Sequence, residues 1–346
     1  MKHQTTRYGE IPFYKIGTFG NTADAFISKK LFLEYKTKYS FPKKGNILIS
    51  ASGTIGRAVI YDGKPAYFQD SNIVWIDNDE TLVKNDFLFY AYSNVKWNTE
   101  HTTILRLYND NFRNTLIPLP PLNEQIAIAN ILSGLDRYLC SLDALILKKE
   151  SVKKALSFEL LSQRKRLKGF NQAWQRVRLG DIANYLTSNL SAEQITQQGK
   201  IKVYDVNNFI GYTDTTFISD KPYISIVKDG SVGRVRILPP KTNILSTMGA
   251  LIANHKTTTE FLFYLLSNFD FKNFTSGSII PHIYFKDYKE KTIFLPPLNE
   301  QNAIANILSG LDNEIASLKN KKRQFENIKK ALNHDLMSAK IRVLKK

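Results

Sequence analysis

The stretch Leu119-Pro-Pro-Leu-Asn-Glu-Gln-Ile-Ala-Ile-Ala-Asn-Ile-Leu-Ser-Gly-Leu-Asp136 occurs again at Leu295–Asp312, and Asn302 in place of Ile126 is the one difference among 18 positions. The offset of 176 residues is far longer than the 20–50 residues of stacking repeats. A chain of 346 residues can hold two ordinary domains. The repeat therefore predicts two copies of one large module, which is typical of a protein whose partner is itself doubled.

The composition is typical of a soluble globular chain, with 43% hydrophobic and 23% charged residues. No apolar run approaches the ~18–20 residues of a membrane span, and residues 1–10 lack the apolar core of a signal peptide. Cys140 is the one cysteine, and the five histidines show no spacing that suggests a zinc site. We therefore expect a cytoplasmic protein that has no cofactor, no structural metal and no membrane contact.

The formal net charge of +17 indicates a polyanionic partner. Most of it lies in two stretches at equivalent places in the repeat. Residues 148–168 carry eight basic against two acidic residues, and residues 319–346 carry ten against two. These stretches could contact DNA phosphates or a protein partner, and a solvated helix face is the alternative for either run alone.

Each copy of the repeat predicts the start of a long helix. Asn123 and Asn299 are suitable N-caps, and the glutamate that follows each places a negative charge on the first turn. In the first copy the pattern continues over residues 135–166, a length of roughly 48 Å at 1.5 Å per residue. Gly134 and Gly310 could mark a kink after a short leading helix, because glycine weakens a helix.

Both helical patterns carry apolar residues at the same positions, mostly at alternating spacings of four and three, which is typical of a coiled coil. A lysine, Lys149 or Lys322, interrupts each stripe once. We expect the two helices to pack on each other, and ordinary bundle packing is the alternative. The predicted packing residues are Leu135, Leu139, Leu142, Ile146, Val152, Leu156 and Leu160, and then Leu311, Ile315, Leu318, Phe325, Ile328, Leu332 and Leu336.

The segments ahead of the helices resemble each other more weakly. Gly53-Thr-Ile-Gly-Arg57 corresponds to Gly230-Ser-Val-Gly-Arg234, and strand patterning dominates both segments. The predicted fold class is α/β (mixed α+β), with two similar globules and two long helices related by a pseudo-two-fold. We divide the chain into a first globule (1–117), a first helical region (118–168), a second globule (169–293) and a second helical region (294–346).

This layout, with Pro-Pro-Leu-Asn-Glu-Gln opening a helix twice, resembles the specificity subunit of type I restriction–modification systems over nearly the whole chain. Trp174-Gln-Arg-Val-Arg-Leu-Gly-Asp181 is similar to the usual start of that family's target-recognition domain, and residues 44–56 are similar to its interior. The resemblance implies that each globule reads one half of a split double-stranded DNA target. It also implies that the helices pack antiparallel as a ruler between the half-sites, that two methyltransferase subunits dock around them, and that restriction–translocation subunits join the full complex.

One departure from the family pattern concerns the first globule, which has no counterpart of Trp174–Asp181. Aligning Ile11 with Ile201 leaves about 25 expected residues ahead of Met1 without a counterpart. The alternative function is therefore a scaffold, or a silent or truncated specificity allele, that binds methyltransferase subunits without reading a complete target. A tandem RNA-binding protein is a more distant alternative, because the aromatic motifs of common RNA modules are missing.

Motifs for catalysis are missing from the sequence. Leucines flank Pro120-Pro121 and Pro296-Pro297, whereas the base-holding loop of an adenine methyltransferase has a polar residue before its prolines and an aromatic residue after them. There is no P-loop for a motor, and Asp24, Glu34 and Lys36 match a nuclease pattern only at chance level. We therefore predict a non-catalytic subunit whose enzymatic partners do the chemistry.

The residues predicted to bind DNA are polar and basic side chains of exposed loops, because such groups reach base edges and phosphates. The Gly-[Ser/Thr]-[Ile/Val]-Gly-Arg turn is either a reading loop or simply a hairpin turn with a solvent-facing arginine. The loops 101–108 and 276–284 are slightly favoured. The candidates are Lys43, Lys44, Ser52, Thr54, Arg57, Gln69, Thr102, Thr103, Arg106 and Tyr108, and then Lys228, Ser231, Arg234, Arg236, Thr275, Ser276, Ser278 and His282.

Overall fold

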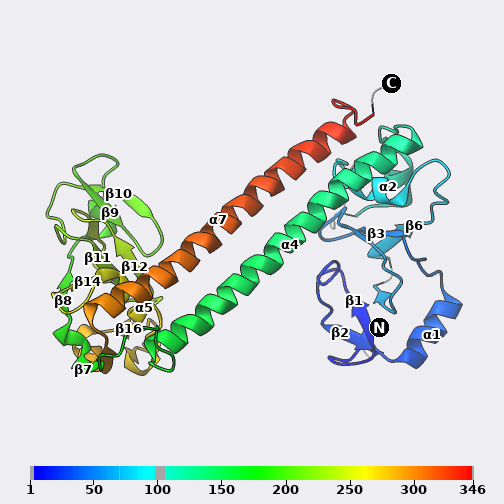
Figure 1. Cartoon of the computed structure of the whole chain (residues 1–346). Helices are drawn as coiled ribbons and strands as arrows, with labels where there is room; N and C mark the ends of the chain where they lie inside the picture. Colours follow the sequence, from blue (N-terminus) through cyan, green and yellow to red (C-terminus); the bar gives the residue numbers. More distant parts are fainter. Residues whose placement is uncertain (1–3, 70, 98–105, 345–346) are drawn as a thin grey trace. The chain divides into compact units, whose positions relative to one another are not determined.

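The computed structural model describes residues 4–69, 71–97 and 106–344. It divides the chain into two compact units, which we call unit 1 (Met1–Asp143 with Asn320–Lys346) and unit 2 (Ala144–Lys319). Each unit holds one globule of strands and short helices, the first half of one long helix and the second half of the other (Figure 1). The predicted mixed α/β class is confirmed. In the described part of the chain no helix has the length and apolarity that crossing a membrane requires.

The globule of unit 1 contains two three-stranded sheets. Its elements are β1 (Ile11–Tyr14), β2 (Ala25–Ile27), α1 (Lys29–Lys38), β3 (Ile47–Ser50), β4 (Ala58–Ile60), β5 (Tyr67–Phe68), β6 (Ile73–Ile76), α2 (Asn85–Tyr92) and α3 (Asn109–Arg113). One sheet has the order β2-β1-β5, and the antiparallel second sheet has the order β4-β3-β6. Leu88 and Tyr92 of α2 share a buried cluster with Ile47 and Ile49, so this helix covers the second sheet.

The globule of unit 2 follows the same plan with more strands. Its elements are β7 (Gln175–Arg178), η2 (Leu179–Asp181), β8 (Ala183–Thr187), η3 (Ala192–Gln194), β9 (Ile201–Tyr204), β10 (Phe209–Thr213), β11 (Tyr223–Val227), β12 (Val235–Leu238), β13 (Asn243–Ile244), β14 (Met248–Ala253), α5 (Thr259–Ser267), η4 (Lys272–Phe274), β15 (Thr275–Ser276), β16 (His282–Ile283), α6 (Phe285–Tyr288) and β17 (Thr292–Leu295). The sheets have the orders β10-β9-β13, β12-β11-β14-β8, β15-β16 and β17-β7. The main core gathers residues of β7, β8, β14, α5 and β17 in one apolar cluster.

The two globules differ at one edge. The hairpin β3–β4 corresponds to β11–β12, and the bridge between Thr6 and Phe26 corresponds to the bridge between Thr196 and Tyr212. β14 pairs with β8 on its second side, whereas β6 pairs only with β3 among the described strands. β7 and β8 thus have no counterpart in the described part of unit 1, as the comparison of the two sequences indicates.

The long helices α4 (Leu122–Leu161) and α7 (Leu298–Met337) have 40 residues each. Both begin one residue before the predicted N-cap. Asn123 and Asn299 instead lie inside the first turn, where each side chain accepts the N–H of the next residue at 2.9 and 2.8 Å.

Two details of the predicted helices are wrong. Gly134 and Gly310 lie within unbroken helix, because a single glycine costs only about 1 kcal/mol and 39 other residues support each helix. Helix α4 also ends at Leu161 rather than at 166, and Gln163 has a positive φ of 62°, which is incompatible with a right-handed helix.

In both long helices the residues that face the other helix continue to alternate at spacings of four and three beyond Lys149 and Lys322. Leu142, Ile146, Leu160, Ile315 and Leu336 are buried, whereas Val152 and Ile328 are exposed. The prediction that Val152 and Ile328 face the other helix is wrong. The unbroken alternation places Lys153 in this position in α4 and Lys329 in α7. These two lysines are only partly exposed, and each binds an aspartate of the facing helix.

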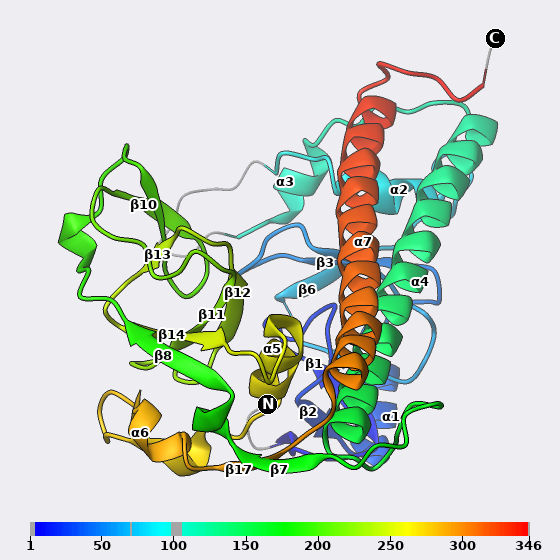
Figure 2. The ribbon, with the colours of Figure 1, turned by 60° about the vertical axis from the view of Figure 1, so that its left-hand side comes forward.

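Within each unit the two helix halves lie side by side and run antiparallel (Figures 1 and 2). In unit 1, Lys329 pairs with Asp136, Lys322 pairs with Asp143 at 2.7 Å, and the rings of Phe325 and Tyr138 lie 4.8 Å apart. In unit 2, Lys153 pairs with Asp312, Lys149 with Glu314 and Lys319 with Glu150, at 2.5, 2.8 and 2.6 Å. As the residue numbers rise in one helix they fall in the other, which defines the antiparallel direction.

The Asn-Glu-Gln part of the repeat joins the start of each helix to its surroundings. Glu300 is buried, accepts hydrogen bonds from Arg166 at 2.6 Å and from Trp174 Nε1 at 2.9 Å, and so holds the segment that follows α4. Gln301 accepts the N–H of Thr258 and donates to the carbonyls of Lys256 and Pro296, which fixes the start of α5. The Gln301 side chain therefore satisfies backbone groups of the segment ahead of α5 and of the segment ahead of α7.

Unit 1 repeats these contacts. Glu124 is 2% exposed and binds Arg342, which follows α7, while Gln125 accepts the N–H of Lys84 and donates to the carbonyls of Leu82 and Pro120. The hydrogen bonds from Arg342 hold the pKa of Glu124 below its ordinary value. The near-identity of the two repeat copies thus has a structural reason in both units.

The lowered pKa of Glu124 predicts a pH-dependent stability. Because the carboxylate binds protons less readily in the folded chain than in the unfolded chain, its contribution is complete above its unfolded pKa of about 4.3 and is lost as the pH falls through the lower folded value. Glu124→Gln should lower the thermal unfolding midpoint at pH 7 by a few degrees, and this difference should shrink below pH 4. The control Glu326→Gln removes an exposed partner of Lys322 and should change little. A Glu124→Gln effect that stays constant between pH 7 and pH 3 would contradict the assignment.

Candidate nucleic-acid interface

A glycine turn follows the central strand of each globule. Gly53 and Gly56 have φ of 66° and 81°, and Gly230 and Gly233 have φ of 83° and 81°. The turns share their backbone hydrogen bonds, since Gly56 N donates to Ser50 O and Gly233 N donates to Val227 O, both at 2.9 Å. Left-handed φ values favour glycine, so the backbone conformation alone favours these residues.

The second glycine of each turn also lies against an aromatic ring. A Cβ atom on Gly56 would meet Trp97 Nε1 at 2.3 Å, and one on Gly233 would meet Phe271 Cδ2 at 2.6 Å. The alternative that the segment is a hairpin turn therefore explains why glycines occupy these positions. It leaves the exposed hydroxyl groups of Thr54 and Ser231 available for a ligand, while the exposed arginines Arg57 and Arg234 also bind residues of their own globules.

The structure brings the turn of each globule together with its favoured loop. In unit 1, Ser52 forms a bridge with Arg106. In unit 2, Asp229 forms a bridge with His282, and Gly230 N donates to Pro281 O at 2.9 Å. The sequence did not require this proximity, because more than 40 residues lie between the turn and the loop in each globule.

In unit 2 the loop is a hairpin made by β15 and β16, in which Ser276 pairs with His282. Ser276 and Ser278 are exposed, and so is Thr275, whose hydroxyl donates to Phe271 O at 2.9 Å. His282 Nδ1 lies 2.7 Å from Asp229 Oδ1, which orients its ring. The result is a rim of hydroxyl and imidazole groups beside the glycine turn.

The arginines of unit 2 are held by a residue that the sequence reading missed. Arg234 donates to Asn207 Oδ1 at 2.7 Å, and Arg236 donates to the carbonyl of Asn207 at 2.8 Å. Arg236 also lies over the ring of Tyr204, 5.3 Å from its centroid. Asn207 lies between β9 and β10, in a run of two asparagines that is a typical turn signal and could have drawn attention to it.

The tip of the β15–β16 hairpin carries apolar residues that were not predicted. Ile279 is 92% exposed and Ile280 is about half exposed, as is Tyr284, which directly follows β16. Two adjacent isoleucines in a Gly-Ser-Ile-Ile-Pro stretch are a readable signal, because apolar residues at an exposed tip have no core to enter.

In unit 1 several predicted side chains already serve the fold. Arg57 donates to Phe19 O at 2.8 Å, and Gln69 accepts the N–H of Ile16 at 3.1 Å. Ser52 donates to Asn72 Oδ1, and Arg106 donates to Ser71 O and lies over the half-exposed ring of Tyr108.

The remaining candidates lie apart from these clusters or outside the described residues. Lys43 forms an exposed pair with Asp77 at 3.2 Å, and Lys44 is its neighbour on the same loop ahead of β3. Lys228 sits next to the bridge at Asp229, and its carbonyl accepts the N–H of Ile283. Thr102 and Thr103 fall outside the described residues. Among the residues that are described, no group of three or more His, Cys, Asp or Glu could hold a metal ion.

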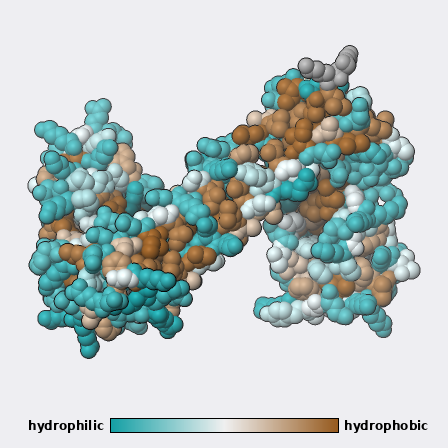
Figure 3. Space-filling model, viewed as in Figure 1, coloured by the Kyte–Doolittle hydropathy of each residue, from teal (hydrophilic) through white to brown (hydrophobic). Residues whose placement is uncertain are grey.

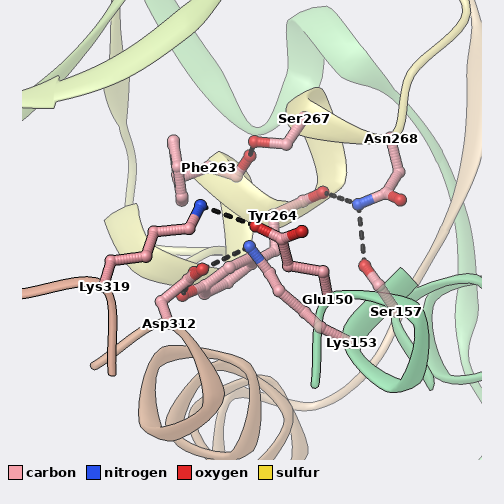
Figure 4. A network of polar contacts seen from close by, with 9 residues as sticks. All are labelled: Glu150, Lys153, Ser157, Phe263, Tyr264, Ser267, Asn268, Asp312 and Lys319. Carbon is pink, nitrogen blue, oxygen red and sulfur yellow. Dashed lines mark hydrogen bonds and ion pairs between the residues drawn. The ribbon is translucent and has the colours of Figure 1, made fainter. Parts of the chain in front are cut away.

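A polar network joins the unit 2 globule to its helix pair (Figure 4). Asp312 of α7 accepts hydrogen bonds from Tyr264 of α5 at 2.8 Å and from Lys153 of α4, whose ammonium lies 5.7 Å from the centroid of the tyrosine ring. Asn268 donates to Ser157 on α4 at 2.8 Å. Burial and the neighbouring Asp312 raise the pKa of Tyr264, so its hydroxyl is a donor at every physiological pH.

Unit 1 contains the equivalent network. Asp136 accepts hydrogen bonds from Tyr90 at 2.7 Å and from Lys329, and Asn333 donates to Ser93 at 2.7 Å. Burial, followed by the hydrogen bond to Asp136, raises the pKa of Tyr90. In both units the globule is therefore fixed to two helices at once, which gives its loops a defined orientation on the helices of the same unit.

The two glycines of the unit 2 turn provide a matched test of the local structure. Gly230→Ala meets no atom within 4 Å, so only its φ penalises it, by about 1–2 kcal/mol. Gly233→Ala has the same φ penalty and also displaces Phe271, which should cost a further ~1–3 kcal/mol. Urea unfolding of the two variants should rank them in this order, and equal losses of stability would contradict the packing described for Phe271.

Comparison with known proteins identifies the family. Residues 1–149 and 171–327 match the type I restriction modification DNA specificity domain. A type I restriction enzyme MjaVIII specificity subunit of Methanocaldococcus jannaschii is 26% identical over 362 residues, which cover 92% of this chain and 84% of that protein. A protein of Haemophilus influenzae named as a type I restriction enzyme specificity subunit is 64% identical over 133 residues, and the match spans 38% of this chain and 34% of that relative.

Solved structures show the same fold. The S subunit of a type I restriction–modification system from M. genitalium superposes with a TM-score of 0.64 at 20% identity, covering 97% of this chain and 91% of that one. A chain from a study of complex assembly in the type I system has a TM-score of 0.55 at 16% identity, with coverage of 85% and 82%. With two matches to the family's domain that together span most of its length, the chain belongs to the specificity subunits of type I restriction–modification systems.

Proposed function

We propose that the chain reads a bipartite double-stranded DNA target, with the turn-and-loop cluster of each globule contacting one half-site. The observation that carries the proposal is the repeated juxtaposition of a glycine turn with a distant loop, through Ser52 and Arg106 in unit 1 and through Asp229 and His282 in unit 2. Because the chain carries two equivalent clusters, each cluster can contact one half of a split DNA target.

The side chains of these clusters suit the major groove. Arginine binds the O6 and N7 atoms of guanine with two donors, and hydroxyl groups bind several base edges. Arg234 is exposed while Asn207 and the turn restrict its position, so little side-chain freedom is left to lose on binding. Ile279 and Ile280 offer apolar contact of the kind that a thymine methyl group accepts. The net charge of +17 supplies the attraction to phosphates that any such interface needs.

We place the enzymatic steps in partner subunits, namely two methyltransferase subunits and, in the full complex, restriction–translocation subunits. The helices support this assignment because they carry equivalent apolar residues that are exposed in both copies. Ile131 and Ile307 are 40% and 37% exposed, and Val152 and Ile328 are also exposed. Figure 3 shows apolar patches on the helical surface between hydrophilic residues. The helices would then act both as the docking surface and as the spacer between the two half-sites.

The reading role predicts that unit 2 determines one half of the target. Arg234→Ala should weaken DNA binding by about 10–100-fold, corresponding to one bidentate base contact of ~1–3 kcal/mol, and should relax one half of the methylated motif. Arg176→Ala removes the same charge from an exposed position on β7 and should leave the motif intact. The measurement is single-molecule sequencing of DNA methylated by the complex with its cognate methyltransferase. An unchanged motif after replacement of the whole of residues 169–293 by another globule would overturn the proposal.

The docking role predicts a separate effect on assembly. The double variant Ile131→Asp with Ile307→Asp should reduce binding of the cognate methyltransferase subunit at least about tenfold in calorimetry, because two apolar contacts would become charged. The matched control, Asn130→Asp with Asn306→Asp, introduces the same charges at exposed neighbouring positions and should bind almost normally. Equal affinity of the two double variants would exclude these isoleucines from the interface.

A further inference from the structure

Asp229 and His282 of unit 2 form a carboxylate–imidazole pair beside the glycine turn. His282 Nδ1 lies 2.7 Å from Asp229 Oδ1, and the two side chains are only partly exposed. The backbones of the two residues form a bridge, and the N–H of Ile283 donates to the carbonyl of Lys228 at 2.9 Å. The main chain therefore fixes the spacing of the pair, so little side-chain freedom is left to lose when the imidazole binds a ligand.

Two further contacts orient the His282 ring. The ring lies at 20° to the ring of Tyr284, with 6.4 Å between the centroids. Its Cδ2 atom lies beside Gly277, where an added Cβ atom would approach Cδ2 to 3.0 Å. The second nitrogen, Nε2, forms no hydrogen bond within the described part of the chain, and it is accessible to solvent. One ring nitrogen thus binds the fold, and the other is open to a ligand.

The carboxylate determines which nitrogen of the neutral imidazole carries the proton. An ionised carboxylate accepts hydrogen bonds and cannot donate one, so Nδ1 is the nitrogen that donates to Asp229. A neutral imidazole has a single N–H, so Nε2 keeps its lone pair and acts as an acceptor. In the major groove an acceptor matches the exocyclic amino group of adenine or cytosine, and guanine and thymine present no such group there.

The equivalent position of unit 1 has the opposite hydrogen-bonding character. The bridge between Ser52 and Arg106 is the counterpart of the bridge in unit 2. A guanidinium group only donates, and its partner in the major groove is guanine, whose O6 and N7 atoms accept. Since a guanidinium group has no alternative tautomer, it needs no carboxylate in place of Ser52. One structural position thus holds a donor in one globule and an oriented acceptor in the other, as expected of a position that selects a base.

We propose that His282 is a specificity-determining residue of unit 2, whose Nε2 atom accepts a hydrogen bond from the exocyclic amino group of an adenine or cytosine in one half-site. Asp229 is the positioning residue that holds the imidazole in its accepting tautomer. The inference rests on the proposed reading of DNA, and it adds the chemical group that one loop position recognises.

The test removes single amino groups from the DNA and leaves the protein unaltered. The complex of the full chain with its cognate methyltransferase subunits is titrated with duplexes in which each adenine of the unit 2 half-site is replaced in turn by purine, and each cytosine by 2-pyrimidinone. These analogues lack only the exocyclic amino group. At one position we expect the wild-type complex to bind about tenfold more weakly, as for the loss of one base contact.

The protein variants assign that loss to the imidazole. His282→Ala should bind the parent and analogue duplexes equally at that position. The matched control His255→Ala removes an exposed histidine ahead of α5 in the same globule and should behave as the wild type does.

A second pair of variants separates the orientation of the ring from its presence. The amide of Asp229→Asn can donate to Nδ1 and so permits the other tautomer, which should reduce the effect of the missing amino group at least about threefold without changing the affinity for non-specific duplex. His282→Arg with Asp229→Ser gives unit 2 the pair found in unit 1. On duplexes with guanine at that position, this double variant should become sensitive to 7-deazaguanine, which lacks the N7 acceptor. An unchanged effect in Asp229→Asn would remove Asp229 from the assignment.

Three results would overturn the proposal. The first is that no amino group affects the wild type and His282→Ala differently. The second is an equal loss of affinity of His282→Ala for every duplex, which would assign the imidazole to a phosphate. The third is sensitivity of the wild type to 7-deazaguanine at the position that depends on His282, which would show that Nε2 donates. All three leave the proposed function intact if replacement of residues 169–293 changes the methylated motif, whereas an unchanged motif would remove the reading role itself.

Discussion

Each unit depends on a buried carboxylate in the first turn of a long helix. Glu300 binds Arg166 from the segment that follows the other helix, and in unit 2 it also binds the indole of Trp174, while Glu124 binds Arg342 in unit 1. A buried charge without its partner is destabilising, because its desolvation is no longer offset. The helix start and the end of the facing helix must therefore be in register before the carboxylate can be buried. In unit 2 the contact with Trp174 adds the entry to the globule, so that one carboxylate aligns three segments.

This constraint explains why the repeat is almost identical in its two copies while the globules differ. Gln125 and Gln301 each satisfy backbone groups of two segments, and Asp136 and Asp312 each bind a tyrosine of the globule and a lysine of the facing helix. Any change at these positions would leave buried polar groups without partners, at a cost of about 1–3 kcal/mol each. Exposed side chains of the turns such as Thr54 and Ser231 are under no such constraint, so their identity can change without affecting the framework.

The sequence predicted the features that repeat or have a period. The two modules, the strand-rich globules and the long helices follow from the 176-residue offset and the spacing of apolar residues. The sequence could not predict that Lys153 rather than Val152 faces the other helix. An apolar residue is expected at a packing position, and only the structure shows Asp312 opposite Lys153. The pairing of turn and loop was equally inaccessible, since contacts between distant segments have no local signal, and the two asparagines at 207 and 208 indicated a turn but not its contacts with Arg234 and Arg236.

The charges along the helices also favour the observed pairing of α4 with α7. In the observed pairing, Lys322 meets Asp143 and Lys319 meets Glu150. If α7 instead paired antiparallel with a second α7 in the same register, Lys319 and Lys322 would face each other, and like charges at such positions are unfavourable. Two copies of α4 would place Asp143 against Ile146 and leave the carboxylate without a cation. Although the helices begin with the same eighteen-residue motif, their later residues at 143, 150, 319 and 322 have thus diverged into charges that favour the pairing of α4 with α7.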